Sequence, residues 1–364
     1  MYSIDDWQLI RRLVLGITLI WFSGSLYSQA DSTLRSGFFR PRDFNRYFIS
    51  DLYSPAIRIN EGFGTNGMDY NSMPERTSEY IFLNETTLGT EIPLLSGTGG
   101  HGDRDFRFSL SLPVSVSIWF DFFNTITAPI LNNDYRFALG EINLLKELPG
   151  RHLRNIGIRL IPFQHESTHL GDEITLYRKK AGFPITRVNV SYEAAETAVI
   201  INDPAGTQRN NLSFCAGGRC LLKTRPSLTY YSPLQPSEGD TTGFTLSKRS
   251  LEGYLRVQYM GPDGPLRIGR FYPVVSAEFR YRVKFGYPYY EPDPDEPMGF
   301  REVVNPEKYV PCLNLFAGWR YRGRPSEPGQ IGGYFRFYTG SNPHGQFRNI
   351  PRYSYFGVVL VYEH

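Results

Sequence analysis

Apolar and polar residues alternate along several stretches of this chain, and a period of two is typical of a β-strand with one apolar face. Residues 106–118 carry Phe, Leu, Val or Ile at every second position, with Arg, Ser or Pro between them. This alternation outlasts a soluble strand of about 5 to 6 residues and suits a tilted membrane-crossing strand of about 9 to 11 residues. The pattern therefore favours a strand that spans a bilayer.

The same alternation returns towards the end of the chain. Residues 275–285 place Val, Ala, Phe and Tyr on one face and Ser, Glu, Arg and Lys on the other. Weaker alternation occurs between turn-rich stretches such as 94–104 and 286–308, in the segments 154–161, 187–193, 251–259, 313–321 and 333–338. We predict an all-β chain that folds as a transmembrane antiparallel β-barrel of about 12 strands.

The first residues have the three parts of a secretory signal. Arg11 and Arg12 precede a short apolar run, and the small residues Ser28 and Ala30 follow it. We expect residues 1–30 to be a signal peptide and residues 31–364 to form one outer-membrane β-barrel domain. Residues 355–362 resemble the terminal-strand signal that the outer-membrane assembly machinery recognises, because a Gly and alternating apolar residues end on an aromatic one. The predicted location is the bacterial outer membrane.

Composition agrees with this fold and argues against one class of partner, nucleic acids. The mean hydropathy is −0.34 and aromatic residues make up 15% of the chain, as expected for a polar lumen inside an apolar, aromatic-rich belt. A net charge of +3 is too small to indicate nucleic-acid binding. Among the 3 cysteines, Cys215 and Cys220 are close in sequence, and an exported chain favours a local disulfide between them that leaves Cys312 unpaired.

The densest polar segment is Gln164–Glu173, which holds two histidines, three acids and a hydroxyl pair. Such a density indicates a functional site, although a hydrophilic loop or strand end is the simpler interpretation. The candidate catalytic residues are His165, Ser167, His169, Asp172, Glu173 and Glu193.

Two kinds of chemistry fit these residues. His165-Glu166-x-x-His169 matches the motif of zinc hydrolases, but that motif needs a helix, and Pro162 and Gly171 leave little room for one. On a strand, by contrast, residues 165, 167 and 169 share one face. The zinc hydrolase is therefore the lesser alternative, and we expect neither a metal nor another cofactor.

The strand arrangement resembles the outer-membrane phospholipase and lipid A deacylase barrels, whose His-x-Ser is completed by an Asn or an acid on a neighbouring strand. A hairpin near residues 180–183 brings Asn189 or Glu193 alongside to orient His165. The resemblance implies a lipid esterase or deacylase in which Ser167 attacks, His165 takes its proton and Gly171 or other backbone amides hold the oxyanion. Outer-membrane lipids are then the partners.

A broader resemblance covers most of the chain and rests on four motifs: Asn133-Asp134-Tyr135, His165-x-Ser167-x-His169-Leu-Gly-Asp-Glu173, Arg187-x-Asn189-x-Ser191-x-Glu193 and Gly340-Ser-Asn-Pro-His-Gly345-Gln-Phe347. Together they resemble an uncharacterised family of bacterial outer-membrane proteins whose hallmark is His-x-Ser-Ser-His-Leu-Gly-Asp-Glu. Thr168 stands here where the second Ser is usual. The family has no assigned function, so the resemblance implies the fold and leaves the activity open.

A second class of function follows from the basic residues expected inside the barrel. They outnumber the acids expected there, such as Glu193 and Glu278, and are Arg107, Arg159, Arg187, Arg256, Arg280, Arg282, Lys284 and Arg336. A basic lumen suits an anion-selective pore. Mutually paired side chains would instead fill a closed barrel that serves as a structural or partner barrel in an envelope protein complex.

Overall fold

The computed structural model describes most of the chain beyond residue 34. The described residues are 35–39, 41, 44–65, 80–99, 106–121, 130–150, 152–171, 185–204, 211–224, 227–231, 250–261, 266, 268–283, 289–297, 299–303, 309–321, 330–345, 348 and 352–363. The predicted signal peptide, residues 1–30, lies outside them. No helix in these ranges is long and apolar enough to cross a bilayer.

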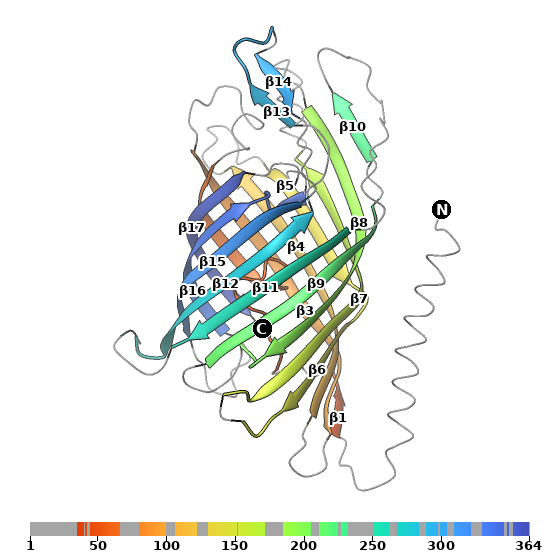
Figure 1. Cartoon of the computed structure of the whole chain (residues 1–364), viewed down its shortest axis with the longest axis vertical. Coiled ribbons are helices and arrows are strands. Elements are labelled where there is room, and N and C mark those ends of the chain that lie inside the picture. The colour runs from red at the N-terminus through yellow and green to blue at the C-terminus, as the bar shows by residue number, and fades with distance from the viewer. Residues whose placement is uncertain are drawn as a thin grey trace, which may run out of the picture.

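The described residues form seventeen strands (Figure 1). They are β1 (Arg35–Phe38), β2 (Ile57–Thr65), β3 (Tyr80–Gly99), β4 (Phe106–Asp121), β5 (Ile130–Ala138), β6 (Glu141–Glu147), β7 (Asn155–Leu170), β8 (Ile185–Ile201), β9 (Asn211–Thr224), β10 (Ser227–Tyr231), β11 (Ser250–Met260), β12 (Phe271–Val283), β13 (Tyr289–Pro292), β14 (Phe300–Val303), β15 (Tyr309–Tyr321), β16 (Gln330–Gly340) and β17 (Tyr353–Glu363).

The long strands close into an antiparallel barrel of 12 strands, as the alternation predicted. β17 pairs with β2, which joins the last strand of the barrel to its first. β5 and β6 share one position, because both pair with β4 on one side and with β7 on the other. β10 extends β8 beyond the barrel, and β13 and β14 form a separate hairpin. Closure leaves no free sheet edge within the membrane.

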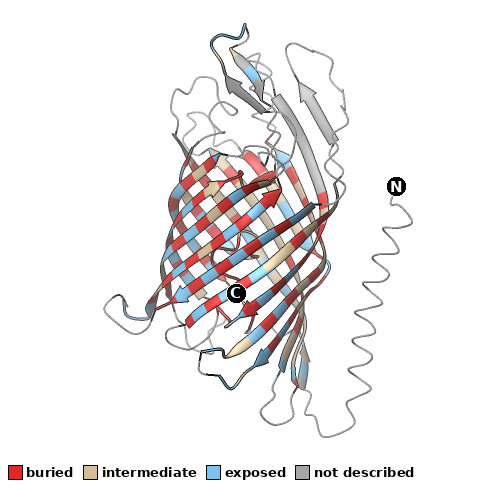
Figure 2. Ribbon diagram, in the orientation of Figure 1, coloured by how far each residue is buried: buried red, intermediate tan, exposed pale blue. Residues whose placement is uncertain are grey.

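Burial alternates along the strands in the way a membrane barrel requires (Figure 2). On β12, the side chains of Ser276, Glu278 and Arg280 are buried towards the lumen, whereas Val275 and Phe279 are 54% and 48% exposed on the outside. Apolar residues also face outwards on β11, β16 and β17. This apolar outer surface on a closed barrel places the protein in the bacterial outer membrane.

The connections at the two ends of the barrel differ in length. Those that follow β2, β7 and β12 span residues 66–79, 171–184 and 284–308, whereas those that follow β3 and β6 span only 100–105 and 148–154. Outer-membrane barrels have long extracellular loops and short periplasmic turns. We therefore call the end with the long connections the outer end and the opposite end the periplasmic end.

Residues 44–56 fold into the barrel and form a luminal loop, which the sequence analysis did not predict. Phe48 and Ile49 are 0% and 1% exposed, and the Ile49 amide donates to the Gln258 side chain on β11 at 3.0 Å. The barrel wall makes room for this loop with glycines: a Cβ on Gly89 would lie 2.8 Å from Pro55, and one on Gly157 would lie 2.2 Å from Asn45. The loop is therefore packed into the lumen.

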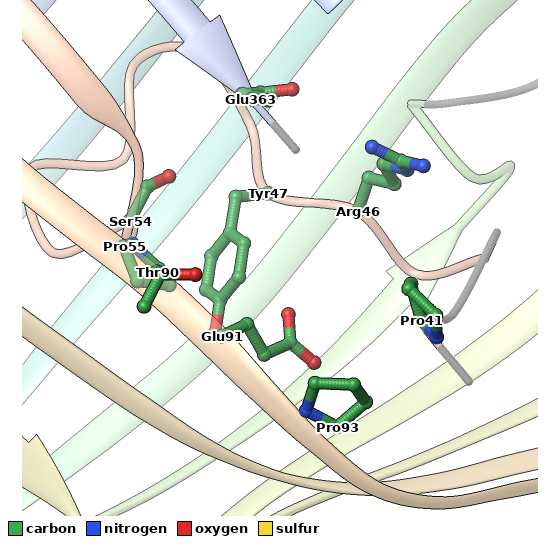
Figure 3. A pocket seen from close by; sticks show the side chains of 9 residues that line it. All are labelled: Pro41, Arg46, Tyr47, Ser54, Pro55, Thr90, Glu91, Pro93 and Glu363. Atoms are coloured by element: carbon green, nitrogen blue, oxygen red, sulfur yellow. The ribbon is translucent and has the colours of Figure 1, made fainter. Parts of the chain in front are cut away.

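The base of the luminal loop lies against β3 at the periplasmic end (Figure 3). Tyr47 and Pro55 of the loop, Thr90 and Glu91 of β3 and Glu363 of β17 line a small pocket there. Its volume of about 50 Å³ holds a few water molecules at most. This pocket is therefore too small to be a ligand site.

Charged side chains join the luminal loop to the barrel wall. Arg256 donates to Asp51 at the tip of the loop at 2.8 Å and also to Glu278 on β12. Arg280 donates to Glu278 at 3.1 Å, and Arg159 lies 3.8 Å from Asp51. The predicted luminal positions of these arginines and of Arg282 and Arg336 are thus confirmed. Arg159, Arg256, Arg280 and Arg336 are each paired with an acid inside the barrel.

Two further residues expected in the lumen lie elsewhere, and two fall outside the description. Glu193 faces outwards and is discussed below. Arg107 lies near the periplasmic end of β4 with its side chain 32% exposed, and it pairs with Glu147. Lys284 lies outside the described residues, and the description of Arg187 covers its backbone alone.

The lumen is also closed from the outer end. Ser341, Asn342 and Arg348, in the connection between β16 and β17, are each 0% exposed. Arg282 donates to the carbonyl oxygens of Asn342 and Pro343 at 3.2 and 2.9 Å and to the Tyr53 hydroxyl at 3.1 Å. Arg282 therefore joins this outer-end segment to the luminal loop.

The predicted disulfide between Cys215 and Cys220 is wrong, because both thiols are free. The two residues lie on the single strand β9 rather than in a loop. Five steps along a strand separate their Cα atoms by about 16 Å, far beyond the roughly 7 Å that a disulfide tolerates. Cys215 is buried among Phe48, Ala198 and Tyr254.

Thiol titration checks this correction. We expect 3 reactive thiols per chain after unfolding without reductant, because all three cysteines are free. Titration after reduction, which should give the same number, is the control. A count of one thiol before reduction and three after it would show that the disulfide is present.

Candidate active site on the outer surface

The polar segment singled out by the sequence lies on β7 and continues the barrel wall as a strand. Gln164, Glu166 and Thr168 are buried towards the lumen, with 0, 4 and 1% exposure. His165 and Ser167 lie on the opposite, outward face and are half-buried, and His169, on that same face, is exposed. The candidate residues of β7 therefore face the membrane side of the barrel.

A β-bulge produces this orientation. The register between β7 and β8 shifts between Ile161 and Gln164, where β7 contains one extra residue. Ile161, like Gly157 and Arg159 before it, faces inwards, so an unbroken strand would have turned His165 inwards as well. Pro162 suits the bulge because it has no amide hydrogen to donate to the ladder. The extra residue thus moves the histidines from the lumen to the outer surface.

His165 has an acidic partner on the neighbouring strand. Glu193 of β8 is directly opposite His165 in the register, and its Oε1 lies 3.8 Å from His165 Nδ1. The two side chains are 26% and 18% exposed, so neighbouring side chains cover most of each of them. Of the two partners expected for His165, Asn189 and Glu193, it is Glu193 that lies opposite it in the register. A carboxylate beside Nδ1 orients the ring and leaves Nε2 to accept a proton.

Ser167 follows His165 on the same outward face. Its partners in the register are Tyr135 on β5 and Ser191 on β8. Residues two apart on a strand are separated by about 7 Å, a distance that an imidazole and a hydroxyl can close through their rotamers. We call His165 and Ser167, which share the outward face of β7, and Glu193, which lies beside His165 on β8, the outward cluster.

Two aromatic rings border the cluster on its other side. The ring of Phe137 is tilted against that of His165, with centroids 5.3 Å apart. Tyr135 meets the His169 ring edge to face at 5.8 Å. Sequence reasoning did not identify these rings, although their outward positions on β5 follow from the same alternation.

The structure does not support the zinc-hydrolase alternative. Because the segment is a strand, His165 and His169 are four residues apart and separated by about 13 Å, too far to share one ion. Glu166, the general base of that motif, faces inwards and receives a hydrogen bond from Arg219 at 2.8 Å. No cluster of three or more potential ligands occurs in the described part of the chain.

The remaining residues that the sequence analysis included in the site are Asp172, Glu173 and Gly171. Asp172 and Glu173 lie outside the described residues. Gly171 is described, and its amide donates to the Leu131 carbonyl at 3.2 Å, so it is engaged in the sheet rather than available to an oxyanion. A Cβ at Gly171 would lie 1.6 Å from the Ile130 carbonyl oxygen. The backbone of residue 130 therefore leaves no room for a side chain at position 171.

Motifs that are far apart in the sequence meet inside the barrel, behind the outward cluster. Asp134 of β5 accepts a hydrogen bond from the Gly345 amide at 3.1 Å and lies 3.2 Å from His344 Nδ1. The His344 ring stacks on Trp119 with centroids 4.2 Å apart. A Cβ on Gly345 would lie 2.6 Å from Thr168 Cγ2. These residues close the outer end of the lumen, so the inward face of the β7 motif is structural.

Comparisons with known proteins do not identify a family. No family model matches the sequence, and no curated protein matches it. The resemblance drawn from the His165–Glu173 segment therefore stays a prediction.

Three solved structures illustrate what the fold is similar to. The translocator domain of the autotransporter NalP from Neisseria meningitidis is 11% identical, with 99% of this chain and 98% of that chain covered and a TM-score of 0.38. A deltaS2 mutant of the TodX monoaromatic hydrocarbon channel is 8% identical, with 84% and 88% covered and a TM-score of 0.37. A Pseudomonas aeruginosa FadL homologue is 8% identical, with 84% and 87% covered and a TM-score of 0.29. The assignment as an outer-membrane barrel rests on this chain's own closed sheet and apolar outer surface.

Proposed function

We propose that this barrel is a serine-dependent lipid esterase or deacylase that acts at the lipid-facing surface of the barrel wall. The observation that carries the proposal is the outward cluster of β7 and β8, in which Glu193 lies 3.8 Å from His165 and Ser167 shares the outward face. A nucleophile, a base and an acid that orients the base are the three side chains of the triad that serine esterases use.

The proposed reaction has two steps. His165 Nε2 takes the proton of the Ser167 hydroxyl while Oγ attacks the ester carbonyl, and the alcohol then leaves with that proton, which gives an acyl-enzyme. Water, deprotonated by the same imidazole, releases the fatty acid and regenerates Ser167. Glu193 holds the ring in position and stabilises its positive charge in both steps.

The position of the cluster fits a lipid substrate. His165 and Ser167 lie in the part of β7 nearest the outer end, and β7 itself ends at Leu170. Near a strand end, the apolar belt gives way to the polar interface, where the ester bonds of lipids lie. The lipid esters of the outer leaflet, in phospholipid or lipopolysaccharide, are thus the substrate class.

The alternatives receive less support from the lumen. The luminal loop fills the centre of the barrel, and Arg282 connects it to the outer-end segment. The luminal arginines are paired with Asp51, Glu278 and Glu85 rather than presented to an anion. A pore and a purely structural barrel in an envelope complex remain predictions, and neither explains the outward His165–Glu193 pair.

Fatty-acid release tests the proposal. The full chain, folded in detergent and in lipid vesicles, is incubated with phospholipid and separately with lipopolysaccharide, and the products are identified by mass spectrometry. We expect release from at least one lipid by the unmodified chain. Thr197→Ala, which removes an exposed outward hydroxyl of β8, is expected to release as much. If folded protein releases nothing from either lipid, the proposed function is wrong.

A Glu193→Gln variant tests the positioning role of the acid. The amide keeps the shape of the side chain but no longer stabilises protonated His165, so we expect kcat to fall roughly 10²- to 10⁴-fold. Undiminished kcat in a folded Glu193→Gln variant would show that the carboxylate has no part in the reaction.

A further inference from the structure

A shallow apolar trough lies on the outer surface beside the candidate active site. It has a volume of about 540 Å³, which is within the range of small-molecule sites. Its lining comes from four neighbouring positions of the wall and consists of Ile57, Leu88, Gly89, Thr90, Val114, Ser115, Val116, Tyr135, Arg136 and Phe137. The outward members of this set are almost all apolar.

The register explains why the wall is hollow here. Leu88 of β3, Val116 of β4 and Tyr135 of β5 lie opposite one another, and the next outward row contains Val114 and Phe137. Val116 therefore lies between the longer side chains of Leu88 and Tyr135, and Val114 has the ring of Phe137 on its β5 side. The two valines form the floor of the trough, and the β5 rings form one of its walls.

The same rows continue into the active-site cluster. Tyr135 pairs in the register with Ser167, and Phe137 pairs with His165, whose ring it contacts. Since neighbouring strands are about 4.8 Å apart, the floor on β4 lies roughly 10 Å from Ser167 on β7. Only the two β5 rings separate the trough from the cluster.

We propose that this trough binds one acyl chain of a lipid whose second, ester-linked chain is placed at Ser167. This inference rests on the proposed function, which it deepens by naming the substrate as a lipid with at least two acyl chains. The spacing supports it, because chains of one lipid lie side by side and the trough and Ser167 are separated by one strand. The aromatic wall then keeps the two chains apart and fixes which ester meets the nucleophile.

Filling the trough tests the effect on turnover. Val116→Phe places a ring on the floor, and we expect kcat/KM to fall about tenfold for a diacyl phospholipid because chain contacts are lost. Turnover of p-nitrophenyl butyrate, which has one short chain, should stay unchanged. Val275→Phe on β12, also outward-facing, is the matched control and should leave both substrates unaffected. Equal effects of Val116→Phe on the two substrates, or none on either, would overturn the inference.

Photo-crosslinking tests binding without relying on hydrolysis. A phospholipid with a diazirine on one acyl chain is incorporated into vesicles that contain the full chain. We expect labelling at 114–116 and 135–137 to exceed that at the equally outward positions 255–257 and 277–279, and Val116→Phe to remove the excess. Excess labelling without any lipid hydrolysis would support acyl-chain binding in the trough and show that the proposed esterase function is wrong. Equal labelling at all of these positions would contradict binding in the trough, whatever the hydrolysis assay shows.

Discussion

A Ser167→Ala variant is expected to lose lipid hydrolysis by a factor on the order of 10³ or more, because the variant lacks the hydroxyl that attacks the ester. His165→Ala should lose a similar factor, and the double variant should lose little more than either single one, since residues of one catalytic unit are not additive. The measurement is the initial rate of fatty-acid release in detergent and in vesicles.

The control for this experiment is the fold of the barrel. Ser167 is half-buried and faces outwards, so Ser167→Ala should keep the resistance to protease and to unfolding that the unmodified chain shows. Thr168→Ala, one residue further, changes an inward hydroxyl that donates to Asn132 at 2.9 Å, and it should retain activity. Undiminished hydrolysis by Ser167→Ala would remove this residue from the chemistry.

An Arg256→Met variant is expected to lose on the order of 3 kcal/mol of stability, because breaking a buried ion pair leaves carboxylates without their partner. The Arg256 side chain is 0% exposed, and its partners Asp51 and Glu278 are 2% and 1% exposed. Arg280 keeps a hydrogen bond to Glu278, which limits the loss. The free energy of unfolding is measured by urea titration in vesicles.

Arg107→Met is the matched control for that variant. Its partner Glu147 has a side chain that is 48% exposed at the periplasmic end, and exposed pairs contribute about 0 to 1 kcal/mol. We therefore expect this variant to unfold near the urea concentration of the unmodified chain. Equal losses in the two variants would show that the luminal loop contributes no special stability through Arg256.

Much of the barrel was predictable because alternation is a direct consequence of strand geometry. The outward Val275 and Phe279 and the inward Glu278 and Arg280 lie where the period of two placed them. The sequence also placed the strand of Glu193 beside that of His165 but did not choose between Asn189 and Glu193 as the partner, and the register selects Glu193. Strand positions can thus be inferred from sequence where the alternation is regular, whereas the register comes from the structure.

The orientation of the site was not predictable, because one extra residue reverses it. The bulge between Ile161 and Gln164 changes which residues of β7 face the lumen. The alternation of apolar and polar residues does not reveal this bulge, and Pro162 is the one residue in the sequence that indicates it. On an unbroken strand, His165 and Ser167 would have been buried among arginines. The chemical interpretation of the segment depends on this local irregularity.

The luminal loop was missed for a different reason. Residues 44–56 have no alternation, and their burial depends on contacts with strands that are distant in the chain, such as that of Ser50 with Ser276 at 3.3 Å. Polar residues such as Asn45 and Asp51 are typical of a solvated connection. In a lumen lined by charged side chains they are buried with matched partners instead.

The two faces of one strand therefore have different tasks. Glu166 and Thr168 face inwards and help to hold the lumen closed, whereas His165 and Ser167 face the membrane. A dense polar motif on a strand combines both sets in a single run of residues. This separation places the two halves of the motif on opposite sides of the barrel wall.

Covalent labelling of Ser167 tests the central claim most directly. The full chain in lipid vesicles is treated with a long-chain alkyl fluorophosphonate, which reacts with a serine that a neighbouring base activates, and the modified residue is located by peptide mass spectrometry. We predict stoichiometric modification of Ser167, abolished in Ser167→Ala and slowed in Glu193→Gln. A folded barrel that stays unmodified, or that is modified at other serines to the same extent, would contradict the assignment of an esterase site to the outer wall.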